Sequence, residues 1–170
     1  GYYHFDGTKW NYPDYFKNST FRWNILDVEP NPTKPTEVYF TNYSFLAGQK
    51  GIYKMNNNSF VKAYIQEPAS PYANRPVGLT FDEQNNLFCT AGYLNVPNQP
   101  GAGFYYYDTA SDSFTVVPIA NTFRMQDVYA RDGILWMPSP LANGGGLMIY
   151  KYNFTPSQLS DDTYKIINKS

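Results

Sequence analysis

The stretch GYYHFDGTKW (residues 1–10) decides the fold, because its pattern returns along the chain. It returns as GIYKMNNNSF (residues 51–60) and GFYYYDTASDSF (residues 103–114), with a looser copy in GLMIYKYN (residues 146–153). Each copy begins with a glycine, continues as an aromatic-rich strand and turns at an Asp or Asn, and the first three close on another aromatic residue. A repeat about every fifty residues predicts one supersecondary unit used several times.

The composition predicts an all-β protein. Aromatic residues make up 19% of the 170 residues, and short Tyr, Phe, Thr and Val runs alternate with Asn, Gly, Pro and Ser, which is typical of strands and turns. No window shows a helical period over ten or more residues, so we expect no long helix. A net charge of −1 without a Lys/Arg cluster argues against a nucleic-acid partner. No stretch reaches the roughly 18–20 apolar residues of a membrane span, so we expect no transmembrane segment in this chain.

Each full unit divides into four strand-like segments joined by turn residues such as Asp6-Gly7 and Asp132-Gly133. We expect a half unit at residues 1–15 and full units at 20–67, 74–119 and 122–170. Repeated four-stranded units of this length predict a partial β-propeller of about three and a half blades. The apolar face of each blade would be covered only by its neighbours.

Leu135-Trp136, followed by GGGLMIY (residues 144–150), resembles the two-component-regulator propeller repeat. Leu87-Phe88 with Gly103-Phe104-Tyr105 matches the same part of that repeat, and residues 3–10 resemble its end. The Gly-Thr pair that the family places after the aromatic residue is absent from every unit. The resemblance implies a sensing or binding propeller outside the cytoplasm (periplasm, cell surface or secreted), as in bacterial sensor proteins and surface proteins of the type IX secretion pathway. The low-charge, Tyr- and Asn-rich composition is also similar to that of secreted proteins of Bacteroidetes.

The number of blades predicts a partner for the chain. A closed propeller has about four to eight blades, and three and a half leave two uncovered faces that invite association. We expect either a fragment covered by the remainder of a larger propeller, or two copies of the chain that close a ring of about seven blades.

The sequence argues against catalysis. His4 is the sole histidine and lies within a strand, without the surroundings of a catalytic triad. With Cys89 as the sole cysteine, neither a disulfide nor a zinc site is expected, and we predict that Cys89 is a buried apolar residue. We predict no cofactor and no metal. An alternative is a propeller hydrolase or lactonase with a metal in the central channel, as in gluconolactonase-like enzymes, which would recruit carboxylates such as Asp27, Asp82 or Asp127.

Three arginines are candidates for binding at the mouth of the channel. They open the first strand of each full unit, and each is followed four residues later by Leu26, Leu79 or Val128; they are Arg22, Arg75 and Arg124. Clustered guanidinium groups could bind carboxylates bidentately, or each could pair with an acid of a neighbouring blade.

Aromatic residues near blade openings or in long loops are further candidates, because Tyr and Trp can stack on sugars or anchor a protein partner. They are Trp23, Tyr72, Tyr93 and Trp136. The sequence thus predicts a non-catalytic binding or sensing propeller for a glycan or protein ligand. A purely structural segment of a larger propeller is a further alternative.

Overall fold

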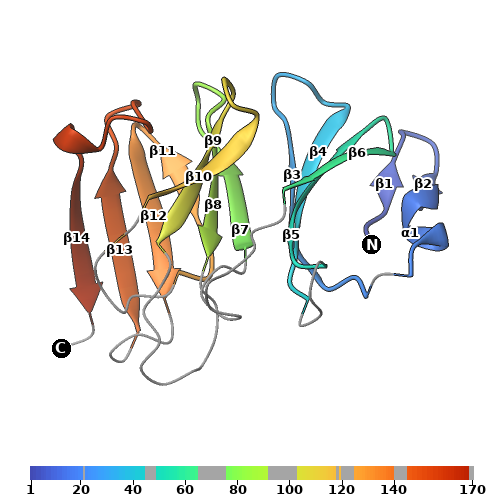
Figure 1. The fold of residues 1–170 in the computed structure, drawn as a ribbon, viewed down its shortest axis with the longest axis horizontal. Coiled ribbons are helices and arrows are strands. Elements are labelled where there is room, and N and C mark those ends of the chain that lie inside the picture. The colour runs from blue at the N-terminus through green and yellow to red at the C-terminus, as the bar shows by residue number, and fades with distance from the viewer. Residues whose placement is uncertain are drawn as a thin grey trace.

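The computed structural model describes residues 1–20, 22–44, 49–64, 76–91, 103–117, 119, 125–139 and 145–168. These residues form an all-β protein of three four-stranded antiparallel sheets and one two-stranded hairpin, arranged as propeller-like blades (Figure 1). The N-terminal hairpin lies at one end of the molecule and the last sheet at the other. The predicted fold class is confirmed.

Within each sheet the strands follow one another in sequence order. The hairpin is β1 (His4–Phe5) and β2 (Trp10–Asn11). The first sheet contains β3 (Ile25–Pro30), β4 (Glu37–Asn42), β5 (Gly51–Asn56) and β6 (Ser59–Tyr64). The second sheet contains β7 (Pro76–Phe81), β8 (Leu87–Ala91), β9 (Phe104–Asp108) and β10 (Ser113–Val117). The third sheet contains β11 (Tyr129–Arg131), β12 (Ile134–Ser139), β13 (Gly146–Lys151) and β14 (Thr163–Asn168).

Tight turns join the strands where the sequence places Asn, Asp and Gly. Asn57 and Asn58 join β5 to β6 with φ of 49° and 63°, and Asp132 and Gly133 join β11 to β12 with φ of 53° and 72°. Two successive left-handed residues give a hairpin turn whose twist matches that of the flanking strands. Asn, Asp and Gly adopt this conformation at the lowest cost, which explains their positions.

Two short helical segments interrupt the β structure. Helix α1 (Asp14–Asn18) follows the hairpin, and the 3-10 turn η1 (Leu159–Asp161) precedes β14. α1 buries Phe16 against the first sheet, where the Phe16 ring lies 5.4 Å from that of Phe40. This single buried side chain holds a helix too short to leave a periodic pattern in the sequence.

The hydrophobic core lies between the sheets. The hairpin and α1 pack on the first sheet around Phe40 and Tyr53. The first sheet packs on the second through Tyr39, Ile52 and Leu79. A third cluster joins the second sheet to the third. Neighbouring sheets therefore bury the faces that they turn toward each other, as propeller blades do. Cys89 is fully buried in this core, as predicted.

The pairing of strands aligns the repeats. Tyr53, Tyr105 and Met148 each lie two residues after the glycine that opens the third strand, and they face Phe40, Cys89 and Met137 respectively. In the first sheet, Phe40 in turn faces Val28, and in the second sheet, Cys89 faces Leu79. Val28 is thus the equivalent of Leu79, whereas the predicted equivalent, Leu26, is 45% exposed. The predicted alignment of the first full unit was therefore wrong by two residues. The residue four positions before Val28 is Asn24, not Arg22.

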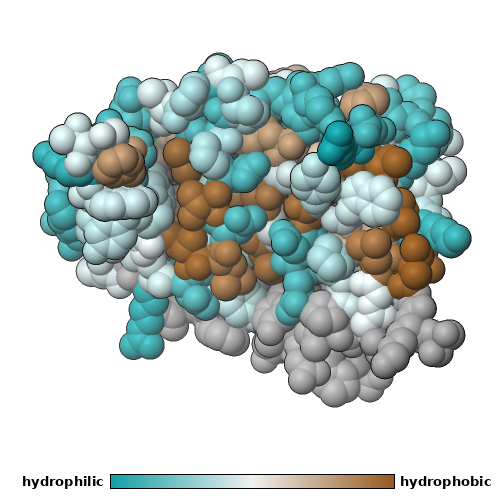
Figure 2. Space-filling view, turned by 180° about the vertical axis from the view of Figure 1, so that it is seen from behind, coloured by the Kyte–Doolittle hydropathy of each residue, from teal (hydrophilic) through white to brown (hydrophobic). Residues whose placement is uncertain are grey.

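The side opposite to Figure 1 shows which surfaces remain uncovered. Figure 2 shows hydrophobic residues gathered over the middle of the molecule and over the end formed by β11–β14. Isolated apolar residues on a surface are normal, but a continuous apolar area marks a contact surface.

Candidate functional site

Three of the seven predicted ligand-binding residues lie within the described residues. Tyr72, Arg75, Tyr93 and Arg124 lie outside them. The backbone N–H of Arg22, an exposed residue, donates a 3.0 Å hydrogen bond to Gln49 Oε1. The structure therefore does not place the predicted arginine group as a unit.

The two predicted tryptophans take different positions. The Trp23 ring packs edge-on against Phe16 and Tyr53, at centroid distances of 5.0 and 5.2 Å. Trp23 belongs to the core between α1 and the first sheet. Trp136 is half-buried on β12 and lies opposite Ile149. Because Leu135 and Met137, its neighbours in the strand, point into the core, Trp136 points to the other, uncovered face of the last sheet.

A groove of about 660 Å³ lies between the hairpin end and α1 on one side and the β5–β6 turn on the other. We call it the N-terminal groove; it is lined by residues 9–15, Lys17 and residues 57–60. One wall is the end of the hairpin with the start of α1, and the other is the β5–β6 turn. The Tyr15 ring stacks on the Phe60 ring at 4.6 Å with an interplanar angle of 8°, which ties α1 to β6. His4 Nδ1 and Asn58 Nδ2, 3.2 Å apart, connect the hairpin to the turn.

The polar groups of the N-terminal groove are held by local bonds. Asn11 Nδ2 donates to Asp6 Oδ2 at 2.7 Å, and Lys17 pairs with Asp14 at 2.7 Å. The Asp6 carboxylate also accepts the backbone N–H groups of Thr8 and Lys9. These bonds, that of Lys9 first, lower the pKa of Asp6 to about 2. Asn57, on the opposite wall, is exposed. The groove thus combines aromatic rings with amide and hydroxyl groups.

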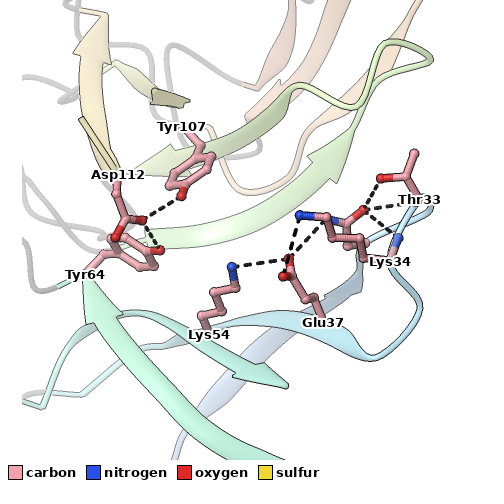
Figure 3. Close-up of polar contacts among 8 residues, drawn as sticks. Thr33, Lys34, Glu37, Lys54, Tyr64, Tyr107 and Asp112 are labelled. Atoms are coloured by element: carbon pink, nitrogen blue, oxygen red, sulfur yellow. Dashed lines mark hydrogen bonds and ion pairs between the residues drawn. The ribbon is translucent and has the colours of Figure 1, made fainter. Parts of the chain in front are cut away.

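Between the first and second sheets, polar groups meet across the interface (Figure 3). Asp112 Oδ1 accepts hydrogen bonds from the hydroxyls of Tyr64 at 2.8 Å and Tyr107 at 2.6 Å, and Lys62 Nζ lies 2.7 Å from Oδ2. These bonds, that of Lys62 first, hold the pKa of Asp112 well below its ordinary value. Nearby, Glu37 pairs with Lys54 at 3.2 Å. The Asp112 group joins β6 of the first sheet to the β9–β10 turn of the second, and the Glu37–Lys54 pair joins β4 to β5 (Figure 3), so both support the architecture rather than a binding site.

A second hollow, of about 340 Å³, is lined by β3, by β7 and by the residues just before β11. Asp27 and Asp127 line it together with Gly78, and these three residues hold the same position in successive units. Asp27 Oδ1 accepts the N–H of Val28, and Asp127 Oδ1 likewise accepts that of Val128, each at 2.8 Å. Burial raises the pKa of Asp27, and the Asp127 carboxylate adds to the rise.

Two of the three predicted channel carboxylates come together here. Asp27 of β3 and Asp127, two residues before β11, hold equivalent positions in their units. Asp82 is separate from them, because it is buried between the second and third sheets and accepts the Tyr152 hydroxyl at 2.7 Å. In the described part of the chain, no three His, Cys, Asp or Glu side chains are grouped closely enough to hold a metal ion.

Sequence reasoning missed the N-terminal groove. Its walls come from segments at least forty residues apart, and no motif marks them. The one available signal was the Asn56-Asn57-Asn58 run, which the sequence explained as a turn. That interpretation is correct for the backbone, and it leaves the exposed Asn57 side chain at the surface while the Asn58 amide lies 3.2 Å from His4 Nδ1.

A scan against protein-family models finds no match, and neither does a search of curated proteins. Among solved structures, the chain is similar to PorZ of Porphyromonas gingivalis, an essential bacterial surface component of the type-IX secretion system. The TM-score is 0.70 at 16% sequence identity, over 96% of this chain and 23% of PorZ. YCF48 from Cyanidioschyzon merolae matches with a TM-score of 0.49 at 17% identity, over 79% of this chain and 43% of YCF48.

The likeness to PorZ shows the fold, and it agrees with the expected likeness to a surface propeller of the type IX pathway. The chain spans less than half of the length of each of these two solved chains. In the part of the chain that the structure describes, no helix is both long and apolar enough to cross a membrane.

Proposed function

We propose that this chain is a non-catalytic binding module of a β-propeller protein that works outside the cytoplasm, and that its ligand is a glycan. The observation that carries the proposal is the N-terminal groove, where aromatic rings and side-chain amides line the same hollow of about 660 Å³. Volumes of this order are typical of small-ligand sites. The chain is either completed by the remainder of a larger propeller or paired with a second copy.

The chemistry of the groove favours a glycan over a protein. An asparagine amide both donates and accepts, as hydroxyl groups do, so Asn57 and Asn58 match a polyhydroxylated ligand. Aromatic rings such as that of Phe60, which is 41% exposed, offer a flat apolar surface for the ring of a sugar. A protein partner would instead require a wider apolar contact area with a polar rim.

The location outside the cytoplasm is supported by the fold of PorZ, a bacterial surface component, and by the low charge and high Tyr content of the chain. Treating intact cells with a protease tests the location. Digestion of the protein while a cytoplasmic marker survives would support a surface location. Protection until the cells are lysed would contradict it.

A hydrolase or lactonase with a channel metal remains the second candidate, because Asp27 and Asp127 face the same hollow. Both oxygens of Asp27 already accept backbone N–H groups, from Val28 at 2.8 Å and Leu79 at 2.6 Å. This bonding favours an architectural role for Asp27. Calorimetric titration with Ca²⁺ tests the alternative. A stoichiometric binding heat that Asp127→Asn abolishes would support the metal site and count against the non-catalytic proposal.

Titration of the chain with neutral tri- and tetrasaccharides, followed by NMR and calorimetry, tests glycan binding. The double variant Asn57→Gly/Asn58→Gly keeps the left-handed turn and removes both amides. We expect affinity to fall about tenfold or more, because each lost hydrogen bond contributes about 1 kcal/mol. Asn85→Gly is the matched control, since Asn85 is also left-handed, with φ of 65°, and lies in another turn. No binding of any saccharide, or binding that the double variant leaves unchanged, would contradict the proposal.

A further inference from the structure

A third hollow, of about 330 Å³, lies where loops of the second and third sheets meet. Three segments line it: the β7–β8 turn with Asn85, the end of β9 with Tyr106 and Asp108, and the loop after β13 with Phe154. Figure 1 shows these three segments along the same edge of the molecule. We call this space the Asn85 hollow. Its volume is within the range of small-ligand sites.

A buried oxygen atom in the wall of the Asn85 hollow lacks a hydrogen-bond donor. This atom is Asn85 Oδ1, to which no group within the described part of the chain donates a hydrogen bond. The backbone of Asn85 is held in place, because its N–H donates to the Asp82 carbonyl at 3.1 Å. A buried acceptor without a donor costs stability, so a donor is expected for it. The Cβ–Cγ torsion of asparagine is broad, so the amide can turn this oxygen toward a donor in the hollow at little cost.

Two aromatic residues line the same hollow. Tyr106 and Phe154 are partly buried and pack against the core cluster that joins the second sheet to the third. Phe154 has a φ of 60°, a left-handed conformation that is rare for an aromatic residue. Its turn is closed by the N–H of Thr155, which donates to the Tyr152 carbonyl at 2.9 Å. Conformations of this kind persist where the surroundings fix them, often at binding sites, and the faces of aromatic rings attract cations.

The charge of the Asn85 hollow favours a cation over an anion. Asp108 lines the hollow, and none of the described residues that line it is a Lys or an Arg. The Asp108 carboxylate accepts hydrogen bonds from the Ser111 hydroxyl at 2.7 Å and from the Ala110 N–H at 3.0 Å. These bonds, that of Ser111 first, lower the pKa of Asp108, so its carboxylate is charged at neutral pH. An ammonium group donates three hydrogen bonds and accepts none, which suits an acceptor without a donor beside a carboxylate.

We propose that the Asn85 hollow binds the protonated amino group of a small organic amine. The ammonium group donates to Asn85 Oδ1 and balances the charge of Asp108, while the alkyl chain packs on Tyr106 and Phe154. A Ca²⁺ ion is disfavoured, because it requires six to eight oxygen ligands, and a neutral saccharide would leave the Asp108 charge unbalanced. The site does not depend on the N-terminal groove or on the ligand proposed for that groove.

NMR titration of the isotope-labelled chain with the diamine cadaverine tests the proposal, and neutral pentanediol of the same chain length is the matched ligand control. We expect cadaverine to shift the amide resonances of the Asn85 hollow saturably and the diol to leave them unchanged. Asn85→Gly keeps the left-handed turn, with its φ of 65°, and removes the acceptor, so we expect the dissociation constant to rise about fivefold or more. Asp108→Asn removes the charge and should raise it about threefold.

Variants at the other end of the molecule separate this site from general effects of charge and folding. Asp6→Asn is the matched control for Asp108→Asn, because Asp6 also accepts backbone and side-chain hydrogen bonds in a hairpin turn. We expect Asp6→Asn and the double variant Asn57→Gly/Asn58→Gly to bind cadaverine as the wild type does. Equal binding of cadaverine and pentanediol, or an unchanged affinity of Asn85→Gly, would overturn the proposal.

The source of the amino group and the proposed glycan are tested separately. Tighter binding of Nα-acetyl-lysine amide than of cadaverine would overturn a free amine as the ligand and indicate a lysine side chain of a protein. Saccharide binding that fails while cadaverine still binds would contradict the proposed function alone. Cadaverine binding that fails while saccharides still bind would contradict the amine site alone.

Discussion

The backbone N–H of Leu79 donates a 2.6 Å hydrogen bond to Asp27 Oδ2, and this bond joins the first strands of two neighbouring sheets. Two residues further along, the N–H of Phe81 donates to Glu29 Oε1 at 3.3 Å. β7 pairs with β8 along one edge only. Carboxylates of β3 therefore accept hydrogen bonds from the backbone N–H groups along the other edge of β7. Burial of these acids near the centre of the molecule raises the pKa values of both Asp27 and Glu29.

The raised pKa of Asp27 predicts a pH dependence of stability. A carboxyl group whose pKa is higher in the folded state stabilises the fold fully below its unfolded pKa, and this contribution is lost as pH rises through the folded value. Asp27→Asn removes this dependence, and because an amide keeps a single acceptor oxygen, it also loses one of the two hydrogen bonds that Asp27 accepts from Val28 and Leu79. We therefore expect the stability advantage of the wild type over Asp27→Asn to shrink as pH rises from about 4 to 7. Urea denaturation at several pH values measures it. An advantage that grows with pH would contradict the prediction.

The lowered pKa of Asp6 predicts a pH dependence of stability of the opposite sign. Its pKa is lowered to about 2 by the N–H groups of Lys9 and Thr8 and by the Asn11 amide. Its contribution is therefore present above the unfolded pKa of about 4 and is lost as pH falls through the folded value. We expect the stability difference between the wild type and Asp6→Asn to vanish as pH falls from 5 to 2, in urea titrations like those for Asp27. A difference that stays constant over this range would refute the assignment.

Gly78 allows the first strands of the second and third sheets to approach. A Cβ atom at this position would lie 2.7 Å from Asp127 Cα and 2.8 Å from its Oδ1. Backbone atoms cannot yield as a flexible side chain does, so we expect Gly78→Ala to destabilise the fold by about 1–3 kcal/mol. The change in urea midpoint measures it. Thr109→Ala, in an exposed turn, should stay within about 0.5 kcal/mol of the wild type; a similar loss in both variants would argue against steric crowding at Gly78.

The Tyr152–Asp82 hydrogen bond connects the third sheet to the second across 70 residues of sequence. Both residues are buried, and a hydrogen bond to a charged group contributes about 1.5–3 kcal/mol. We expect Tyr152→Phe to lower stability by about this amount, and thermal unfolding should show a fall of about 2–4 °C for each kcal/mol lost. Tyr3→Phe removes an exposed hydroxyl and should leave the melting temperature unchanged. Equal melting temperatures of Tyr152→Phe and the wild type would show that the bond contributes nothing.

Local pattern predicts the strands and turns of this protein well. The glycine-to-aromatic spacing and the alternation of apolar residues locate the third and fourth strands, because side chains alternate along a strand whatever surrounds it. Asn57-Asn58 and Asp132-Gly133 predict tight hairpins, because their left-handed conformations depend on the residue type itself. The predicted alignment of β3 with the first strands of the other units was wrong, because the register of β3 depends on which residues of β4 lie opposite it.

The candidate sites could not be predicted in the same way. The arginine group was inferred from that alignment, and Trp23 was treated as a surface aromatic although it packs on Phe16 and Tyr53. The N-terminal groove depends on α1, whose five residues form no recognisable period. Asp27 and Asp127 meet only because three sheets converge on one centre.

The sequence by itself therefore determined the unit: a four-stranded antiparallel blade, its turns and its repetition. These follow from steric preferences and from a period of two, which act over a few residues. Only the tertiary structure decided which faces of the blades are covered, which carboxylates meet at the centre and where a groove remains. Those outcomes depend on how blades pack against one another, and contacts between residues fifty or more positions apart leave no trace in local sequence pattern.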